Sequence, residues 1–124
     1  MQQILVIDDD VLVRSTISRI LERKGYEVLA ADDGAQGLSM FERHHPDLVI
    51  TDIIMPEKEG IETIREIRRL SPEIKIIAIS GGGRLGNFDF LDIATQFGAA
   101  EVLGKPFDAA DLLDRVDRCL GTAD

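Results

Sequence analysis

Short runs of consecutive apolar residues alternate along the chain with longer segments in which apolar residues recur every three or four positions. The runs occupy residues 4–7, 28–30, 48–50, 74–79 and 102–103. Runs that are nearly continuous in apolar character, rather than alternating with polar residues, are typical of parallel strands covered on both faces. The pattern therefore predicts five buried strands.

The segments that follow these runs have the period of amphipathic helices. Their apolar stripes are Val13, Ile17, Ile20 and Leu21; Ala35, Leu38 and Phe41; Ile61, Ile64 and Ile67; Phe90, Ala94 and Phe97; and Leu112, Leu113, Val116 and Leu120. Gly25 is expected to end the first helix. Asp33, with Gln36 three residues later, is expected to cap the second, and Asp108 the fifth. The sequence therefore predicts five helices, one after each strand.

Strict alternation of strands and helices predicts an α/β fold, a flavodoxin-like (βα)₅ unit with a doubly wound parallel sheet and right-handed crossovers. The expected strand order is 2-1-3-4-5. In such a sheet, ligands bind beyond the carboxyl ends of the strands, at the switch between strands 1 and 3. Candidate functional residues should therefore lie just after the apolar runs.

Polar residues do follow four of the five runs. Asp8 and Asp9 come after the first, Asp52 after the third, Ser80 after the fourth and Lys105 after the fifth. Because strands 1 and 3 are expected to be neighbours, the aspartates should converge in one acidic pocket. Crowded carboxylates repel each other, and their pKa values rise unless a cation intervenes.

The chemistry of this set points to phosphoryl transfer. Oxygen-only ligands with open positions suit Mg²⁺, which commonly bridges carboxylates and phosphate oxygens. Lys105 would supply a compact positive charge and Ser80 a hydroxyl donor for phosphoryl oxygens. Asp10, the third aspartate of the first cluster, is expected to cap the first helix instead.

Composition narrows the possible partners. The chain has 124 residues, and 23 acidic against 14 basic residues give a formal net charge of −9. This balance argues against direct binding to nucleic acid and against docking on an anionic membrane. A single cysteine cannot form an internal disulfide, which is compatible with a cytoplasmic location.

The sequence resembles the receiver domains of bacterial response regulators over essentially its whole length. The matching segments are residues 4–10 with the Asp8-Asp9-Asp10 cluster, Asp52-Ile53-Ile54-Met55-Pro56 with Gly60 following, Ser80, and Lys105-Pro106-Phe107. Each motif is weak alone, but their order and spacing together are specific.

The resemblance implies that Asp52 is the phosphoacceptor of a two-component or phosphorelay system. It implies that Asp9 and Asp52 bind Mg²⁺ directly, together with the backbone carbonyl of Ile54, while Asp8 acts mainly through water. A domain of this family is a signalling phosphoacceptor that catalyses its own phosphotransfer and a slow autodephosphorylation. It changes shape on phosphorylation, and a downstream protein responds to that change.

The same resemblance assigns the remaining positions. Ser80 and Lys105 would contact the phosphoryl group, and the Lys105–Pro106 bond is expected to be cis. The phosphoryl group would come from a phosphohistidine on a histidine kinase or a phosphotransfer protein. Apart from the resemblance, Leu12 lies beside the expected pocket and off the apolar stripe of the first helix, so Leu12 and Phe107 are candidate contacts for this donor. Ordinary surface exposure or core filling is the alternative for both.

Two features depart from the family pattern. Receivers usually carry Tyr or Phe three residues before the lysine, and this chain has Val102 there. Glycines occupy residues 81–83, so a rearrangement of residues 81–90 that moves Phe88 or Phe90 is one hypothesis for the missing aromatic switch. Static packing of both rings in the fourth helix is the alternative.

Two other functions remain open from the sequence. A haloacid-dehalogenase-like phosphatase would use Asp8 as the nucleophile and Asp10 as the general acid/base, but that leaves Asp52 unexplained. A degenerate receiver would serve only as an interaction module. We expect a single receiver domain over residues 1–124 with no output domain in this chain; the sequence leaves open a homodimer through the fourth and fifth helices.

Overall fold

The structure is a computed structural model that describes residues 2–52, 59–80 and 98–121. Strands and helices alternate along these residues. In chain order they are β1 Gln3–Ile7, α1 Val11–Arg23, β2 Glu27–Ala31, α2 Gly34–His44, β3 Leu48–Asp52, α3 Glu59–Leu70, β4 Lys75–Ser80, β5 Glu101–Gly104 and α5 Ala109–Leu120.

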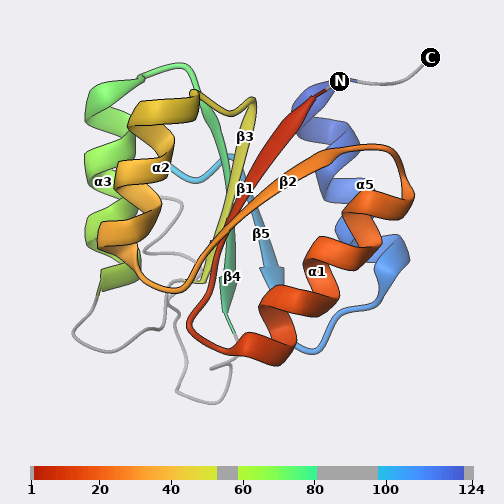
Figure 1. The fold of residues 1–124 in the computed structure, drawn as a ribbon. Coiled ribbons are helices and arrows are strands. Elements are labelled where there is room, and N and C mark those ends of the chain that lie inside the picture. Colours follow the sequence, from red (N-terminus) through yellow and green to blue (C-terminus); the bar gives the residue numbers. More distant parts are fainter. Residues whose placement is uncertain (1, 53–58, 81–97, 122–124) are drawn as a thin grey trace.

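The strands form one parallel sheet in the order β2-β1-β3-β4-β5 (Figure 1). This confirms the predicted fold class and strand order. In β1, Ile7 pairs with Ala31 on one side and with Thr51 of β3 on the other. The residues after Ile7 and Thr51 therefore emerge side by side at the carboxyl edge of the sheet.

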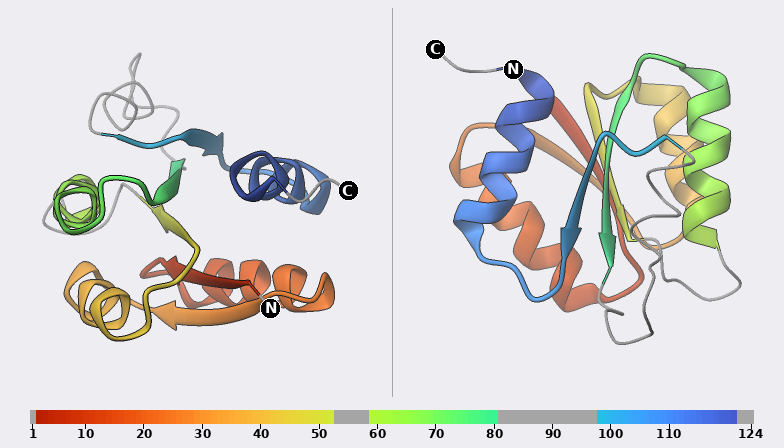
Figure 2. Two further views of the ribbon diagram at one scale, coloured as in Figure 1. Left: turned by 90° about the horizontal axis from the view of Figure 1, so that it is seen from above. Right: turned by 180° about the vertical axis from the view of Figure 1, so that it is seen from behind.

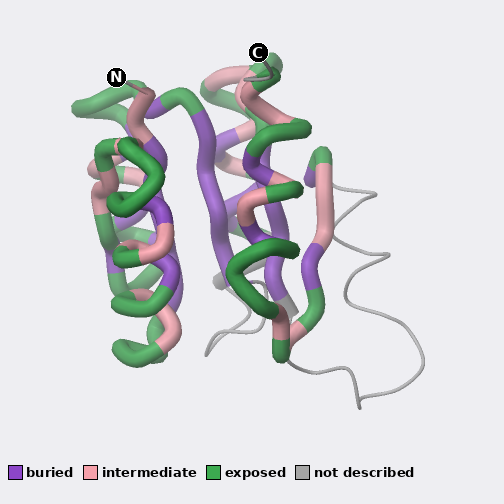
Figure 3. Tube along the Cα trace, turned by 90° about the vertical axis from the view of Figure 1, so that its right-hand side faces the viewer, coloured by how far each residue is buried: buried purple, intermediate pink, exposed green. Residues whose placement is uncertain are grey.

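Helices cover both faces of the sheet, with α1 and α5 on one face and α2 and α3 on the other (Figures 1 and 2). Each face has its own core. Ile17, Leu21, Leu112 and Val116 anchor the helices on one side, and Phe41, Ile64 and Ile67 on the other. The central strands β1, β3 and β4 are largely buried between these layers, whereas the edge strands β2 and β5 are more exposed (Figure 3). Burial on both faces explains why the strands are almost continuously apolar.

Two functional candidates lie inside strands rather than after them. Asp52 is the last residue of β3 and pairs with Ile79, and Ser80 is the last residue of β4 and pairs with Gly104. The backbone pairing thus continues one or two residues beyond each apolar run. The functional side chains are consequently carried by the sheet itself, which is more rigid than a loop.

The predicted helix ends are confirmed, with one difference in detail. The Asp33 carboxylate accepts a hydrogen bond from the backbone amide of Gln36 (2.8 Å). The Gln36 side chain accepts one from the backbone amide of Asp32 (2.8 Å), rather than from that of Asp33. Asp108 caps α5 by accepting the Asp111 amide. Gly25, with a φ of +99°, follows the end of α1.

Helix α2 packs very closely on the strand that leads into the site. A Cβ atom at Gly37 would lie 2.4 Å from Cδ1 of Ile7, which is fully buried. Glycine is therefore required at this position for the helix to approach β1. This contact also fixes the backbone immediately before Asp8.

A half-buried arginine, Arg68, secures the chain where it enters β5. The guanidinium of Arg68 donates to the backbone carbonyls of Pro72 (2.8 Å), Ile74 (2.5 Å) and Gly98. Burial lowers the pKa of Arg68 from its ordinary value. These contacts tie α3 to the segment that leads through β5 to Lys105.

Some sequence predictions fall outside the described residues. The expected fourth helix, the glycines at 81–83 and the phenylalanines Phe88 and Phe90 lie within residues 81–97, and Ile54 lies within 53–58. The switch hypothesis for residues 81–90 therefore remains a prediction. No helix in the part of the chain that the structure describes is long and apolar enough to span a membrane.

Candidate functional site

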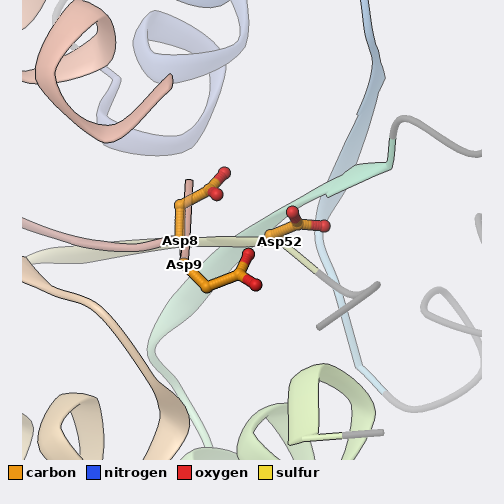
Figure 4. Close-up of side chains that lie close together, drawn as sticks. All are labelled: Asp8, Asp9 and Asp52. Atoms are coloured by element: carbon orange, nitrogen blue, oxygen red, sulfur yellow. The ribbon is translucent and has the colours of Figure 1, made fainter. Parts of the chain in front are cut away.

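Three aspartates meet at the carboxyl edge of the sheet, where β1 and β3 end (Figure 4). Asp8 and Asp52 are buried, with 1% and 5% of their surface exposed, whereas Asp9 is exposed. One carboxylate oxygen from each of the three residues lies within 4.8 Å of the others. This confirms the acidic pocket that the sequence predicted.

The donor set fits a small divalent cation. Magnesium–oxygen bonds are about 2.1 Å long, so two oxygens on the same ion lie roughly 3 to 4 Å apart. Oxygens within 4.8 Å of one another need only a small movement to reach that geometry. Because the oxygens come from carboxylates, the pocket also has the hard ligand chemistry that such ions prefer.

Lys105 follows the edge strand β5, and its side chain reaches the carboxylates of this pocket. Its Nζ lies 3.2 Å from Oδ2 of Asp52 and 3.5 Å from Oδ2 of Asp8. Burial by itself lowers the pKa of Lys105, but attraction to Asp52 and Asp8 outweighs it, so the pKa rises above its ordinary 10.5. The ammonium group is therefore charged at all physiological pH values.

The pKa of Asp8 is raised by its surroundings. Burial raises its pKa above the ordinary 3.8, and the charge of Asp52 raises it further. A hydrogen bond from the Asp10 amide to Oδ1 (2.9 Å) and the ion pair with Lys105 act in the opposite direction. The net rise shows that the Asp10 amide and Lys105 do not fully offset burial and the charge of Asp52, so an additional cation would be stabilising here.

The raised pKa of Asp8 predicts how the stability of the metal-free protein depends on pH. Because the pKa of Asp8 is raised by folding, its contribution to stability is fully present below pH 3.8 and is lost as pH rises through the raised pKa. Asp8→Asn is expected to raise the metal-free unfolding free energy at pH 7, because it removes a carboxylate whose charged form is disfavoured by burial and by Asp52, while Lys105 keeps Asp52 as a partner. It should also flatten the pH dependence above pH 3.8, measured by urea denaturation without divalent cations.

A matched control for this substitution is Asp47→Asn. Asp47 is exposed at the start of β3, and like Asp8 it accepts a backbone amide, that of Gln3 (2.8 Å). Asparagine can keep this hydrogen bond, so little change in stability is expected. A loss of stability in Asp8→Asn that exceeds the change in the control would contradict the electrostatic interpretation.

Asp10 has a structural role, as predicted. Its carboxylate accepts the amides of Leu12 (2.9 Å) and Val13 (3.4 Å) and so caps α1. It is not among the three aspartates that cluster. An acid/base role for Asp10, which the phosphatase alternative requires, would need this cap to be released.

The other positions singled out from the sequence are Ser80, the Lys105–Pro106 bond and Val102. Ser80 ends β4 beside Gly104, on the same edge of the sheet, but its side chain is outside the described part of the structure. The Lys105–Pro106 peptide bond is cis, as expected. Val102 packs partly buried against the core on the α2–α3 side, and its carbonyl accepts Nε of Arg115 (3.2 Å).

One contact at the site was not anticipated from the sequence. Arg14, in the second turn of α1, donates from Nη1 to the backbone carbonyl oxygen of Asp8 (2.7 Å). The only sequence signal was an arginine beside the apolar stripe of the helix, next to Val13. A backbone carbonyl acceptor leaves no trace in the sequence, so this partner was not predictable.

Comparison with known proteins agrees with this geometry. Residues 4–117 match the family described as "Response regulator receiver domain". The chemotaxis protein CheY of Bacillus subtilis is 37% identical over 119 residues, which cover 95% of this chain and 97% of CheY. The transcriptional regulatory protein PdtaR of Mycobacterium tuberculosis is 33% identical; the match covers 94% of this chain but 55% of PdtaR.

Solved structures lead to the same family. A response regulator receiver domain protein from Clostridium thermocellum superimposes with a TM-score of 0.89 at 36% identity, covering 98% of this chain and 95% of that one. Family, fold and acidic pocket agree, and a phosphatase active site is not needed to explain any of them. The chain belongs to the response regulator receiver domain family, and it is a signalling phosphoacceptor rather than a classical enzyme.

Proposed function

We propose that Asp52 is the residue that accepts the phosphoryl group. The observation that carries the proposal is the position of the Asp52 carboxylate, which contacts Lys105 at 3.2 Å and lies within 4.8 Å of the Asp8 and Asp9 carboxylates. A carboxylate oxygen of Asp52 would attack phosphorus and form a P–O bond. The bond from phosphorus to the donor nitrogen breaks at the same time, and its electron pair stays on the departing imidazole.

Within this proposal, Asp9 and Asp52 would hold Mg²⁺ directly, together with the backbone carbonyl of Ile54, and Asp8 would act mainly through water. When bound, Mg²⁺ would offset the negative charge of the carboxylates and the phosphoryl oxygens. The support for the ion is the fit of the carboxylate oxygens and the raised pKa of Asp8. Lys105 and Ser80 would contact phosphoryl oxygens, and Lys105 needs only to exchange its present carboxylate partners for them.

The phosphodonor in this proposal is a histidine kinase or a phosphotransfer protein that carries a phosphohistidine. An open groove of about 490 Å³ adjoins the site, lined by Leu12, Val13, Thr16, Lys105, Pro106 and Phe107. Leu12 is 73% exposed at this groove, so its apolar side chain is available to a partner that docks there. Lys105 belongs to both the groove and the acidic pocket, so an apolar helix seated there would bring its phosphohistidine close to Asp52.

Leu12→Asp tests this docking role. It is expected to slow transfer from a phosphohistidine protein at least tenfold, because a charge would replace an apolar side chain that lines the groove. Transfer from acetyl phosphate, which needs no docking surface, should keep its wild-type rate. Equal slowing with both donors would assign Leu12 to the pocket itself and contradict the docking role.

The proposal includes a cytoplasmic location, where the free thiol of Cys119 stays reduced. Burial raises the pKa of Cys119 to about 11, so the thiol is protonated and unreactive at neutral pH. The downstream target would be a protein that binds the phosphorylated form more tightly than the unphosphorylated one.

The metal requirement provides the test of the proposed function. Incubation with acetyl phosphate and Mg²⁺ is expected to add one phosphoryl group to the protein, detected by intact mass spectrometry. Replacing Mg²⁺ with excess EDTA should abolish the modification, because the carboxylates then repel the incoming anion. Modification of equal extent in EDTA would contradict the metal assignment, and no modification in either condition would contradict phosphoacceptance at this site.

A further inference from the structure

The contact between Arg14 and the backbone of Asp8 has no part in the phosphoryl transfer proposed above. The half-buried guanidinium reaches back from α1 and donates to the Asp8 carbonyl oxygen at 2.7 Å. That oxygen belongs to the peptide unit between Asp8 and Asp9, and a peptide unit is planar. A clamp on this carbonyl therefore sets the orientation of the peptide plane that joins two of the three clustered aspartates.

Other hydrogen bonds around this turn make the clamp part of a closed network. The Asp8 amide donates to the carbonyl of Ala31 (3.1 Å), which secures the residue to β2. The Asp10 amide donates to the Asp8 carboxylate (2.9 Å), and the Arg14 amide donates to the Asp10 carbonyl (2.9 Å). Asp8 is thus held at its amide, its carbonyl and its carboxylate. Asp9 lies between two residues whose backbone is fixed.

We propose that Arg14 is a positioning residue, which locks the Asp8–Asp9 peptide plane so that both carboxylates face the cation site before a cation arrives. Arg14 acts through the backbone and touches neither the cation nor the phosphoryl group. This inference rests on the proposed function, because it takes Asp8 and Asp9 to be among the residues that hold Mg²⁺, Asp9 directly and Asp8 through water. Groups that orient metal ligands from behind typically change metal affinity by roughly 10- to 100-fold when they are removed.

The direction in which the Mg²⁺ dissociation constant changes when Arg14 is replaced distinguishes a positioning role from a purely electrostatic one. If Arg14 acted mainly through its positive charge, removing it would make the pocket more negative and tighten Mg²⁺ binding. If Arg14 acts by holding the peptide plane, removing it lets the Asp8 and Asp9 carboxylates move. Mg²⁺ binding then becomes weaker, because binding must also order these two side chains. The two roles therefore predict opposite changes in the dissociation constant.

The experiment compares Mg²⁺ dissociation constants, from amide NMR titration, for wild type, Arg14→Met and Arg14→Lys. Arg14→Met keeps much of the side-chain length but has no donor, and we expect its binding to be about tenfold weaker. Arg14→Lys retains a donor for the Asp8 carbonyl and should recover part of the loss. The control is Arg19→Met, which removes the same charge from an exposed position on α1 and should leave the dissociation constant within about twofold.

A second measurement does not depend on the metal. In metal-free protein, the Asp10 amide is expected to exchange with solvent about tenfold faster in Arg14→Met than in wild type or Arg19→Met, because its acceptor on Asp8 is no longer held. Unchanged exchange and unchanged or tighter Mg²⁺ binding in Arg14→Met would overturn the inference. If wild type binds no Mg²⁺, the metal assignment fails separately, and the exchange rate alone decides whether Arg14 is the clamp.

Discussion

Replacing Asp52 with asparagine is expected to eliminate phosphorylation by acetyl phosphate in the presence of Mg²⁺. Asparagine preserves the shape of the side chain but replaces the carboxylate by a carboxamide, whose oxygen is a much weaker nucleophile. It also removes one carboxylate from the cluster with Asp8 and Asp9 and the shorter of the two contacts to Lys105. Intact mass spectrometry should therefore show no phosphorylated species under conditions that modify the wild-type protein.

Two further asparagine variants make this result specific. Asp10→Asn should keep the cap on α1, because asparagine caps helices about as well as aspartate, and it should still be phosphorylated. Asp8→Asn should be modified more slowly but not blocked, since Asp8 is assigned an indirect role with the cation. Modification that persists in Asp52→Asn and disappears in Asp8→Asn would move the acceptor to Asp8 and contradict the assignment.

Removing the positive charge of Lys105 is expected to destabilise the metal-free protein as well as impair phosphorylation. Lys105→Met leaves the Asp8 and Asp52 carboxylates buried without their ammonium partner. Breaking a fully buried ion pair from one side costs roughly 3–5 kcal/mol. Because 23% of the Lys105 side chain is exposed and water screens the pair, we expect a loss of about 2 kcal/mol at pH 7.

The pH dependence gives this prediction a definite sign. The repulsion between Asp8 and Asp52 requires both to be ionised, so the deficit of Lys105→Met should shrink as pH falls through the raised pKa of Asp8 toward 3.8. In wild type, the pKa of Lys105 lies above 10.5, so its stabilising effect is complete below pH 10.5 and is lost at higher pH. Urea denaturation at several pH values would measure both effects.

The control for Lys105→Met is Lys75→Met. Lys75 begins β4 at the opposite edge of the sheet and is exposed, so the same change should alter stability little. Mg²⁺ should restore much of the stability lost in Lys105→Met, because a divalent cation can replace the ammonium group between the carboxylates. A deficit that is constant with pH and insensitive to Mg²⁺ would instead reflect lost packing of the lysine stem.

The raised pKa values link this behaviour to the function of the domain. In the metal-free protein, Asp8 and Asp52 both contact Lys105, and the pKa of Asp8 stays raised despite this contact. The site is therefore held in a state that favours the arrival of a cation. Preorganisation of this kind stabilises the charge of a transferring group without reorganisation during the reaction.

Much of this site could be predicted from the sequence because its residues are tied to regular features of the chain. Apolar runs identified the strands, and the topology of alternating strands and helices placed β1 beside β3. The grouping of Asp8, Asp9 and Asp52 followed from this, and the structure confirms it. The cap by Asp10 was predictable because capping is a local interaction between neighbours in the sequence.

Other features could not be predicted because they depend on the conformations of side chains and on backbone acceptors. That Lys105 contacts Asp8 as well as Asp52 depends on the distance between strands and on the lysine rotamer. That Asp52 and Ser80 lie within strands depends on backbone pairing, which continues beyond the apolar runs. The Gln36 side chain accepts the amide of Asp32, one residue away from the partner that its spacing suggests.

By itself, the sequence therefore determined the fold, the edge of the sheet that carries the chemistry and the types of residue that gather there. These follow from hydrophobic periodicity and chain connectivity, which are properties of residue order. Only the tertiary structure decided how charge is balanced among Asp8, Asp52 and Lys105, and that Arg14 holds the carbonyl of Asp8. Burial and hydrogen-bond direction set those properties, and both exist only once the strands and helices have packed together.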